Sequence, residues 1–355
     1  MEKIRDRRID FLKGFGIILV VLGHIQIPDI LKSWLYLFHM PLFFALSGCV
    51  YKENRNKTIN EFVKEKARQL LWPYAVYGIF YIVFEGVFSI FSGEMNRQFI
   101  VKHVTAYIYG NYIWENNSDY IGVLWFLLAL FCTTCMYKIV CTYVKAEKHR
   151  IMTCSTITII GVFIDKICRK MSMRLPWCLD IAFVAIIFFA VGVELKKCKI
   201  ADGLRAFWLG GLSICLGTAM GGLNIFYLYR KSCLVRVDML TMEYGIALLF
   251  VFSAFFIIWG IWQLVSVLYQ KSSNLYFSEI MEKIGRKSLL IMILHLKILK
   301  IIQCVIWKSN IKTEHWVILF MVDIIITYVT SAYITKYFSF TYKCPIKRKE
   351  EDSND

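Results

Sequence analysis

Ten apolar windows of about 17–25 residues follow one another along this chain of 355 residues. They lie at residues 11–28, 33–51, 70–91, 120–144, 151–167, 177–195, 203–222, 243–269, 288–306 and 316–338. A helix of this length crosses the hydrocarbon core of a bilayer and satisfies its own backbone hydrogen bonds there. The pattern therefore predicts an all-α, polytopic integral membrane protein with about ten transmembrane helices. Within one window, the small residues Gly217-x-x-x-Gly221 predict close packing against a neighbouring helix.

Composition and charge agree with a chain that lies mostly in lipid. The sequence is 58% hydrophobic, with a mean hydropathy of +0.54. Its formal net charge is +16, but the basic residues cluster between the apolar windows. Charge placed in this way is typical of membrane topology and of contact with anionic lipid headgroups. We therefore expect membrane lipids as partners and no nucleic acid.

The twelve cysteines do not predict a metal site. They are scattered, mostly within the apolar windows, and Cys132 and Cys135 alone form a C-x-x-C pair. A zinc site needs a second pair at suitable spacing, and the sequence has none. We interpret the cysteines as packing thiols and predict no metal cofactor.

The distribution of Lys and Arg predicts the orientation of the chain. The larger share falls on the side that holds the N-terminus, the even-numbered loops and the C-terminus. This excess places both termini in the cytoplasm. The basic-then-apolar start resembles a signal peptide, but it lacks a small-x-small cleavage site, so we expect an uncleaved first span. The predicted organisation is one transmembrane domain over residues 1–345 and a short cytoplasmic tail over 346–355.

Charged and imidazole groups line one face of the first window. Residues three, four, seven and fourteen apart share a helix face, so Asp10, Lys13 and His24 lie in one stripe. Asp10 and Lys13 can pair near the cytoplasmic end. His24 lies roughly 21 Å deeper, at about 1.5 Å per residue. The second window descends from the outer side, so its His39 reaches a depth similar to that of His24. Pro41 lacks an N–H and frees a backbone acceptor there.

Three elements near the N-terminus agree in order and spacing with a known family. They are the Arg8-x-Asp10-x-x-Lys13 entry, His24 in the first span, and the Phe-His-Met-Pro-Leu-Phe-Phe run that continues to Ser-Gly at 38–48. Together they resemble the membrane-bound acyltransferase 3 family, the bacterial surface-glycan O-acetyltransferases that include fucose 4-O-acetylase-like proteins. The resemblance implies a multi-pass enzyme of the bacterial plasma membrane. It would move an acetyl or other small acyl group from acetyl-CoA to a hydroxyl of a cell-surface glycan or a lipid-linked sugar.

The resemblance also assigns a catalytic group. The position of His24 is regarded in the family as the catalytic His, and an imidazole is suited to take a proton from a hydroxyl at neutral pH. We place His39 and Asp10 in the same group. His39 has two interpretations, one as a catalytic residue and one as a residue that orients or supports the site. The general interpretation of any single buried His is a hydrogen-bonded core residue.

A second set of residues is assigned to the acyl donor. Gly285-x-x-Ser288, followed by His295, looks like a late motif of the same family. We predict that acyl-CoA is held by basic and polar groups at the cytoplasmic mouth, namely Arg8, Lys13, Arg286, Ser288 and His295. Other interpretations stay open, because Arg8 and Arg286 also suit topology charges and Ser288 also suits a helix cap.

Trp125 and Phe126 are the predicted substrate-binding residues. The Trp-Phe-Leu element at 125–127 opens the fourth span and resembles a further family element. It suits the wall of an acceptor pocket, and it equally suits an interfacial anchor. The aromatic outer loop at 92–119 has the same two interpretations.

The sequence departs from the family in one place, and it leaves a second function class open. The family often has Arg-x-x-Arg before the third span, whereas here Arg68 is the one Arg in that stretch. The alternative function is an exporter or flippase of a surface polysaccharide. Such transporters often show repeated, discontinuous helices, and we find no matched pair of them in this sequence.

Overall fold

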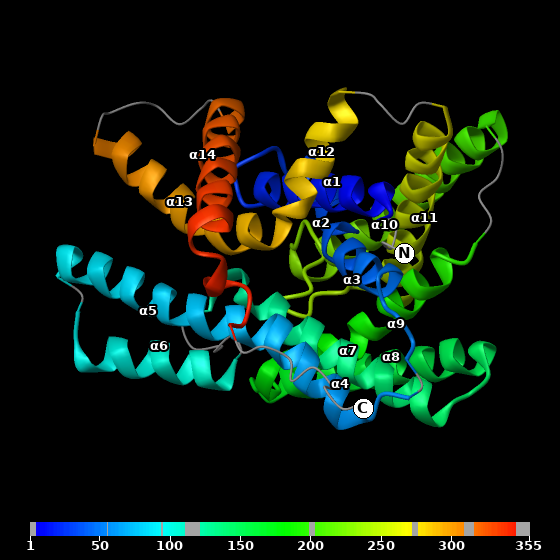
Figure 1. Cartoon of the computed structure of the whole chain (residues 1–355), viewed down its shortest axis with the longest axis horizontal. Coiled ribbons are helices and arrows are strands. Elements are labelled where there is room, and N and C mark those ends of the chain that lie inside the picture. The colour runs from blue at the N-terminus through cyan, green and yellow to red at the C-terminus, as the bar shows by residue number, and fades with distance from the viewer. Residues whose placement is uncertain are drawn as a thin grey trace, which may run out of the picture.

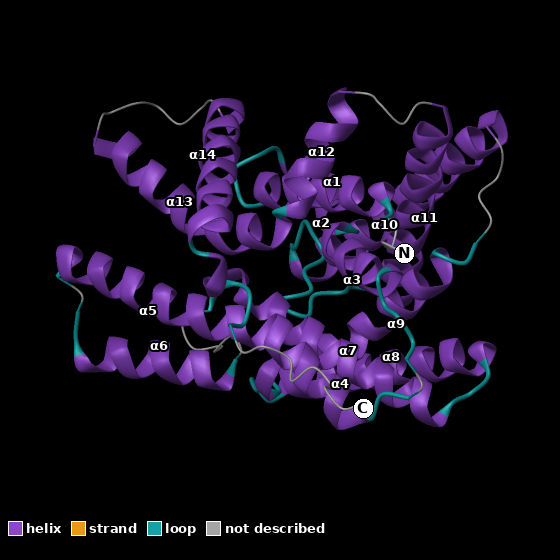
Figure 2. Cartoon of the chain, in the orientation of Figure 1, coloured by secondary structure: helices purple, strands orange, loops and turns teal. Residues whose placement is uncertain are grey.

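The computed structural model describes residues 5–54, 56–93, 95–110, 121–198, 203–271, 276–308 and 316–345. Apart from one isolated β-bridge between Asp238 and Glu243, the regular structure of these residues is helical (Figures 1 and 2). The longer helices are α1 (Arg7–Gly23), α3 (His39–Cys49), α5 (Trp72–Ser92), α7 (Trp125–Tyr143), α8 (Glu147–Lys170), α9 (Leu179–Leu195), α10 (Gly203–Ser232), α11 (Ala247–Lys271), α13 (Ser288–Lys308) and α14 (Trp316–Tyr337). The predicted tail at 346–355 lies outside the described residues.

The predicted windows coincide with these helices, and the all-α membrane class is confirmed. Nine stretches of the described chain are long and apolar enough to cross a membrane. The first window, which holds α1, is not among these nine. Its helix α1 has 17 residues, and Ile17 and Val21 are wholly buried within the bundle.

The second window, predicted as one helix over 33–51, is two helices. Helix α2 (Asp29–Tyr36) ends before Leu37, and α3 begins at His39. Phe38 between them has the non-helical angles φ −143° and ψ −16°. Pro41 then falls in the first turn of α3, where its missing N–H costs nothing. A continuous helix would have brought the Pro41 ring against the carbonyl of Leu37, so the break removes that clash.

Three helices lie between the predicted spans. They are α4 (Ile59–Lys66), α6 (Arg97–Tyr109) and α12 (Tyr276–Arg286), and all three are too short or too polar to fill a spanning window. Two of these helices begin at N-terminal capping residues. Thr58 and Glu61 form a capping box at α4, and Asn96 accepts a hydrogen bond from Phe99 N at 2.7 Å at α6. Such helices place polar groups beside the spans without crossing the bilayer.

Ion pairs join the loops on one side of the bundle. The Arg150 guanidinium donates to Glu53 at 2.8 and 3.0 Å, which links the segment after α7 to the loop after α3. Lys197 pairs with Glu147 at 2.8 Å, which adds the end of α9 to this group. All of these are even-numbered loops in the predicted topology.

The odd-numbered loops meet one another on the opposite side. Arg174 donates from Nη1 to the Leu240 carbonyl at 2.7 Å, and its own carbonyl accepts from the Tyr109 hydroxyl at 2.6 Å. These contacts tie the segments after α8, α10 and α6 together. The described contacts therefore separate into two groups, one among the even-numbered and one among the odd-numbered loops.

Helices α10 and α11 lie in close contact through small residues, as the Gly217-x-x-x-Gly221 pattern predicts. The Ser253 hydroxyl of α11 donates to the Gly217 carbonyl at 2.8 Å. A Cβ on Gly217 would lie 2.8 Å from the Ser253 carbonyl oxygen, so a larger residue would push the helices apart. Small residues at such an interface let two backbones approach within van der Waals contact.

Charged side chains at membrane depth connect α5 to α13. Glu85 lies near the middle of α5 and receives Lys297 at 2.7 Å and Lys300 at 2.5 Å. The ammonium of Lys297 also lies 4.0 Å from the ring centre of Tyr81. Two lysines in an apolar span are explained by this pairing, because an isolated charge there would be costly.

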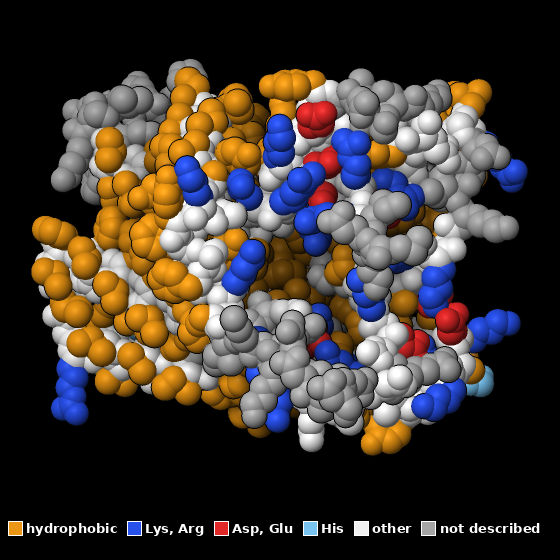
Figure 3. Space-filling model, viewed as in Figure 1, with side chains coloured by type: hydrophobic (Ala, Val, Ile, Leu, Met, Phe, Trp, Pro, Cys, Tyr) orange, Lys and Arg blue, Asp and Glu red, His pale blue; other side chains and the backbone are white. Residues whose placement is uncertain are grey.

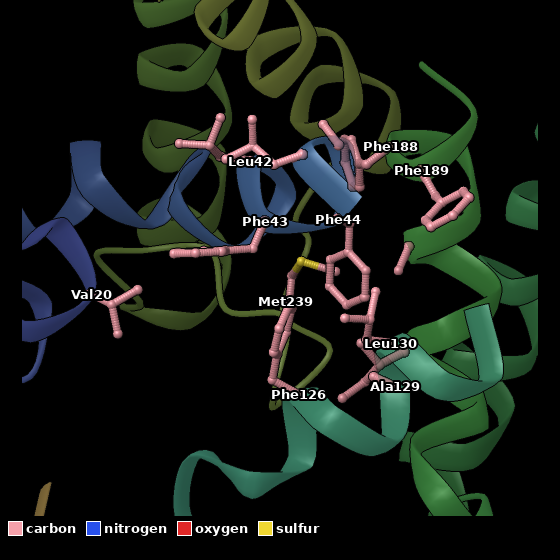
Figure 4. Packing of buried hydrophobic residues seen from close by; sticks show 14 of the residues in the cluster. Val20, Leu42, Phe43, Phe44, Phe126, Ala129, Leu130, Phe188, Phe189 and Met239 are labelled. Atoms are coloured by element: carbon pink, nitrogen blue, oxygen red, sulfur yellow. The ribbon is translucent and has the colours of Figure 1, made fainter. Parts of the chain in front are cut away.

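Aromatic side chains fill the centre of the bundle, where α3, α7 and α9 meet. The Phe126 ring of α7 lies 5.1 Å from that of Phe44 and 6.0 Å from that of Phe43, both of α3. Figure 4 shows Phe44 between Phe126 of α7 and Phe188 of α9, with the ring of Phe43 extending to one side. Edge-to-face pairs of this kind hold the start of α7 against α3 and so fix one wall of the site described next.

Candidate active site

A pocket of about 550 Å³ of empty space, its open mouth included, lies where several helices converge near the C-terminal end of α1. Side chains from α1, α2, α3, α7, α13 and the loop between α10 and α11 line it: Val20, His24, Tyr36, His39, Met40, Val123, Trp125, Phe126, Asp238, Met239, Leu240 and Met292. Most of the lining is apolar, and a few polar groups converge in it, as is typical of small-molecule sites.

His24 is placed by the end of α1. The helix begins behind Asp6, whose carboxylate accepts from Arg8 N at 3.1 Å, and it ends at Gly23. His24 follows as the C-cap residue, with its backbone N–H on the Val21 carbonyl at 3.2 Å. Its side chain is exposed to the pocket rather than packed into the core. A residue at this position can turn its ring toward a ligand without disturbing the helix.

His39 is held rigidly in the same pocket. Its Nδ1 lies 2.7 Å from the Leu35 carbonyl, and its ring meets the edge of Tyr36 at 4.7 Å between centres. Because a carbonyl can only accept, Nδ1 must carry the proton, and Nε2 is left as an acceptor. The predicted meeting of His24 and His39 at one depth is therefore present in the structure. The break between α2 and α3 supplies the Leu35 carbonyl that orients His39.

A third imidazole, His295 of α13, lies against His24. The ring centres of His24 and His295 are 5.1 Å apart, and His295 is wholly buried. Sequence analysis grouped His295 with the acyl donor at the cytoplasmic mouth. The structure places it beside His24, wholly buried next to the pocket, while Ser288 at the start of α13 lies seven residues, or about 10 Å of helix, away. Its role toward the donor stays a prediction. The sequence does not show that His24 and His295 are neighbours, because they come from helices far apart in the chain.

Trp125 and Phe126 line the pocket from the first turn of α7. Helix α7 begins at Trp125, where the sequence places the start of the fourth span. Both side chains are buried on the protein side and face the cavity. This location agrees with the predicted pocket wall, and their contact with an acceptor stays a prediction.

Asp238 and Tyr36 line the pocket without having been singled out by sequence. Asp238 lies in the loop between α10 and α11, and its Oδ1 accepts from Leu240 N at 2.9 Å. Burial raises the pKa of Asp238 above its ordinary value, an effect that the neighbouring Arg236 opposes. The Arg236 guanidinium in turn lies 4.9 Å from the centre of the Tyr36 ring. Sequence analysis did not select Asp238, because it looked like the other acidic residues near the ends of the predicted spans.

Asp10 lies at the other end of α1, away from the pocket, and its predicted place in the catalytic group stays a prediction. Helix rise separates it from His24 by about 21 Å. Its carboxylate receives Arg5 Nη2 at 2.7 Å, and Arg286 Nε lies 3.7 Å away, in place of the predicted partner Lys13. Asp10 is 3% exposed, and its carboxylate holds the basic side chains of Arg5 and Arg286 in place rather than contacting His24.

Most of the predicted donor-binding residues lie around this same end of α1. Arg8 folds back onto Asp6, with Nη2 to Oδ2 at 2.7 Å, and lies 5.0 Å from the Trp262 ring centre. Arg286, at the end of α12, is 51% exposed, and Ser288 is the first residue of α13. We call this set the basic mouth: Arg5, Arg7, Arg8, Asp10, Lys13, Glu282 and Arg286. Its binding of acyl-CoA stays a prediction.

Glycine lets α12 approach α1 closely enough to build the basic mouth. A Cβ on Gly285 would lie 1.8 Å from the Asp10 carbonyl oxygen, so the two backbones touch there. The contact brings Glu282 beside α1, where it accepts from Arg7 Nε at 3.0 and 3.1 Å and from the Tyr269 hydroxyl at 2.6 Å. Nothing in the sequence singled out Glu282, since these partners come from two distant helices, α1 and α11.

Figure 3 shows a hollow near the centre of the molecule, between α1 and α7 in that view. Hydrophobic side chains lie deep in the hollow, and Lys and Arg side chains gather around it. A basic rim over an apolar interior is complementary to a ligand that has an anionic end and a long, less polar arm.

The fold and the site define the class of this protein as an all-α membrane bundle with a histidine-lined pocket. Comparison of the sequence with known proteins gives its family. Residues 6–336 match the model of acyltransferase 3, described as an acyltransferase domain, so the chain belongs to that family. It is a membrane acyltransferase.

Two curated relatives are both named nodulation protein NolL. The protein from Mesorhizobium japonicum is 29% identical over 151 residues, which cover 39% of this chain and 37% of the relative. The protein from Sinorhizobium fredii is 31% identical over 170 residues, which cover 44% and 42%. The matches thus span less than half the length of these relatives. No solved structure matches the chain.

Proposed function

We propose that this membrane acyltransferase moves an acetyl or other small acyl group from acyl-CoA to a hydroxyl of a cell-surface or lipid-linked sugar. The observation that carries the proposal is the position of His24, exposed to a pocket within a chain that belongs to an acyltransferase family. Family membership favours an enzyme over the exporter hypothesis. We place the protein in the bacterial plasma membrane with both termini in the cytoplasm.

His24 is the proposed general base. A sugar hydroxyl is a weak nucleophile at neutral pH, and a neutral imidazole can remove its proton as the oxygen attacks the thioester carbon. The carbon–sulfur bond then breaks, and the proton on His24 passes to the departing thiolate. The products are an acylated sugar and a free CoA thiol, and His24 returns to its neutral form. His39 and Tyr36 border the same space and orient the reacting groups in this proposal.

The donor and acceptor approach from opposite sides in this proposal. The anionic nucleotide of acyl-CoA docks at the basic mouth, where Arg286 offers a half-exposed guanidinium and Arg8, Lys13 and Ser288 lie close by. Its slender arm then extends inward to the pocket, about 21 Å along α1. The acceptor sugar enters from the outer side and packs against Trp125 and Phe126, because an aromatic face suits the apolar face of a sugar ring.

Transfer of label from acetyl-CoA tests the proposal directly. Membranes with the intact chain are compared with membranes that hold His24→Ala, at equal amounts of inserted protein. We expect label in a glycan or lipid-linked fraction, and a loss of about 10²–10⁴ in rate for the variant. His149→Ala is the matched control, because His149 is an exposed histidine of α8. Full transfer by His24→Ala would contradict the assigned base.

A further inference from the structure

We propose that His295 positions the catalytic base, by accepting an N–H from His24 and so fixing which nitrogen of His24 faces the acceptor hydroxyl. The inference rests on the proposed function of His24. It gives His295 a role in the pocket, 5.1 Å from the ring of His24, in place of the donor-binding role that the sequence suggested.

The hydrogen bonds of His295 define its protonation. Its Nδ1 lies 2.7 Å from the Met292 carbonyl and 3.1 Å from the Ile291 carbonyl. Both carbonyls are acceptors, so Nδ1 carries the hydrogen and Nε2 has a free lone pair. Nε2 is buried and has no hydrogen-bond partner among the described residues. Burying an acceptor without a hydrogen-bond partner is unfavourable, so this atom calls for a donor.

The spacing of the two rings suits one nitrogen-to-nitrogen hydrogen bond. Such a bond spans about 2.9 Å, and each ring nitrogen lies about 1.1 Å from its ring centre, which places the centres about 5 Å apart. The observed separation is 5.1 Å, with the rings tilted by 50°. His24 is exposed to the pocket, so its ring can turn to point a nitrogen at Nε2.

The other groups around His24 are less well placed. His39 also keeps an acceptor at Nε2, but its ring packs on Tyr36, whereas the ring of His295 lies 5.1 Å from that of His24. Lys32 and Arg236 are donors. Asp238 lies in the same pocket but accepts from Leu240 N and lies 3.9 Å from Arg236 Nε. Among the described residues, Nε2 of His295 is thus a buried, unengaged acceptor whose ring packs directly against that of His24.

The consequence for catalysis is a base held in one tautomer. When one nitrogen of His24 donates to His295, the other nitrogen is unprotonated and faces the pocket. After His24 takes the hydroxyl proton, the same bond stabilises the imidazolium. The proton then leaves to the thiolate, and His295 neither gains nor loses one. This is the part that a carboxylate plays beside the histidine of a serine hydrolase, carried here by a neutral imidazole.

Two variants of His295 separate this role from a structural one. In His295→Asn the amide N–H replaces the donor at Nδ1, but no acceptor occupies the Nε2 position. In His295→Gln the amide oxygen replaces the acceptor at Nε2. We expect His295→Asn to lower kcat about 10²-fold with little change in KM, and His295→Gln to retain kcat within about 10-fold of the intact chain. A purely structural His295 would give equal kcat in both variants, which would overturn the proposal.

A second measurement does not depend on transfer. Diethyl pyrocarbonate acylates an unprotonated, accessible imidazole nitrogen, and mass spectrometry of the peptide that contains His24 reports the rate. We expect His24 to react at similar rates in the intact chain and His295→Gln, and about 10-fold more slowly in His295→Asn. Equal rates in the two variants would overturn the proposal. Should the intact chain fail to transfer any acyl group, the proposed function fails, and the labelling rates still decide the role of His295.

Discussion

The pocket around His24 and the basic mouth stand at opposite ends of α1, and they are built in opposite ways. In the mouth, each carboxylate is paired: Glu282 with Arg7 and Tyr269, and Asp10 with Arg5. In the pocket, the imidazoles keep free nitrogens. Nε2 of His295 is unpartnered within the described structure, and the side chain of His24 is open to the cavity.

The difference indicates that the two ends of α1 have different roles, proton transfer at one end and ligand binding at the other. A group that must exchange a proton needs a lone pair that no other group occupies, and the pocket supplies it. A group that must hold a charged ligand gains from a rigid, prearranged set of donors, and the ion-pair network supplies that. The contrast makes three predictions, each of which alters the mouth and leaves the residues of the pocket in place.

The largest effect is expected from the contact between α1 and α12. In Gly285→Leu, the new side chain meets the Asp10 backbone, since even a Cβ would lie 1.8 Å from its carbonyl oxygen. Overpacking of this kind costs about 1–3 kcal/mol or more. We expect thermal unfolding in detergent at a clearly lower temperature, together with loss of donor binding.

Gly211→Leu on α10 is the matched control for this variant. A Cβ on Gly211 would have nothing within 4 Å, so the substitution has room. Unfolding temperatures that fall equally in Gly211→Leu and Gly285→Leu would show that the α1–α12 contact does not hold the mouth together.

Glu282 gives the next effect, and it depends on pH. Burial alone would raise the pKa of Glu282, but hydrogen bonds from Tyr269 and Arg7 outweigh it and hold the pKa below the ordinary value. The stability that Glu282 contributes is therefore present at neutral pH and is lost as the pH falls through its lowered pKa. We expect Glu282→Gln to cost about 1–2 kcal/mol at pH 7. The difference from the intact chain should shrink below about pH 4. A difference that grows on acidification would contradict this account.

Local patterns predicted much of this molecule, and contacts between distant segments explain the rest. Helical periodicity and a hairpin were enough to bring His24 and His39 to one depth, and Pro41 carried a signal for the break that window hydropathy ignored. The approach of His295 to His24 was not predictable, because it depends on how α13 crosses α1. The same holds for Asp10, whose partner Arg286 comes from α12 and is brought near by Gly285.

The smallest effect is expected from Arg286, the half-exposed cation that α12 contributes to the mouth. Its side chain is 51% exposed and lies 3.7 Å from Asp10 and 3.3 Å from Glu282, so part of the guanidinium stays open to a ligand. We expect Arg286→Ala to raise KM for acetyl-CoA about 3–10-fold at unchanged kcat, because a phosphate contact made equally in ground and transition states affects binding alone.

Acetyl-dephospho-CoA, which lacks the 3′-phosphate, makes the test more specific. If Arg286 binds the 3′-phosphate, the intact chain should show a raised KM for this analogue, and Arg286→Ala should treat both donors alike. A variant that still favours acetyl-CoA over the analogue would place the phosphate on other residues and leave Arg286 as a topology charge.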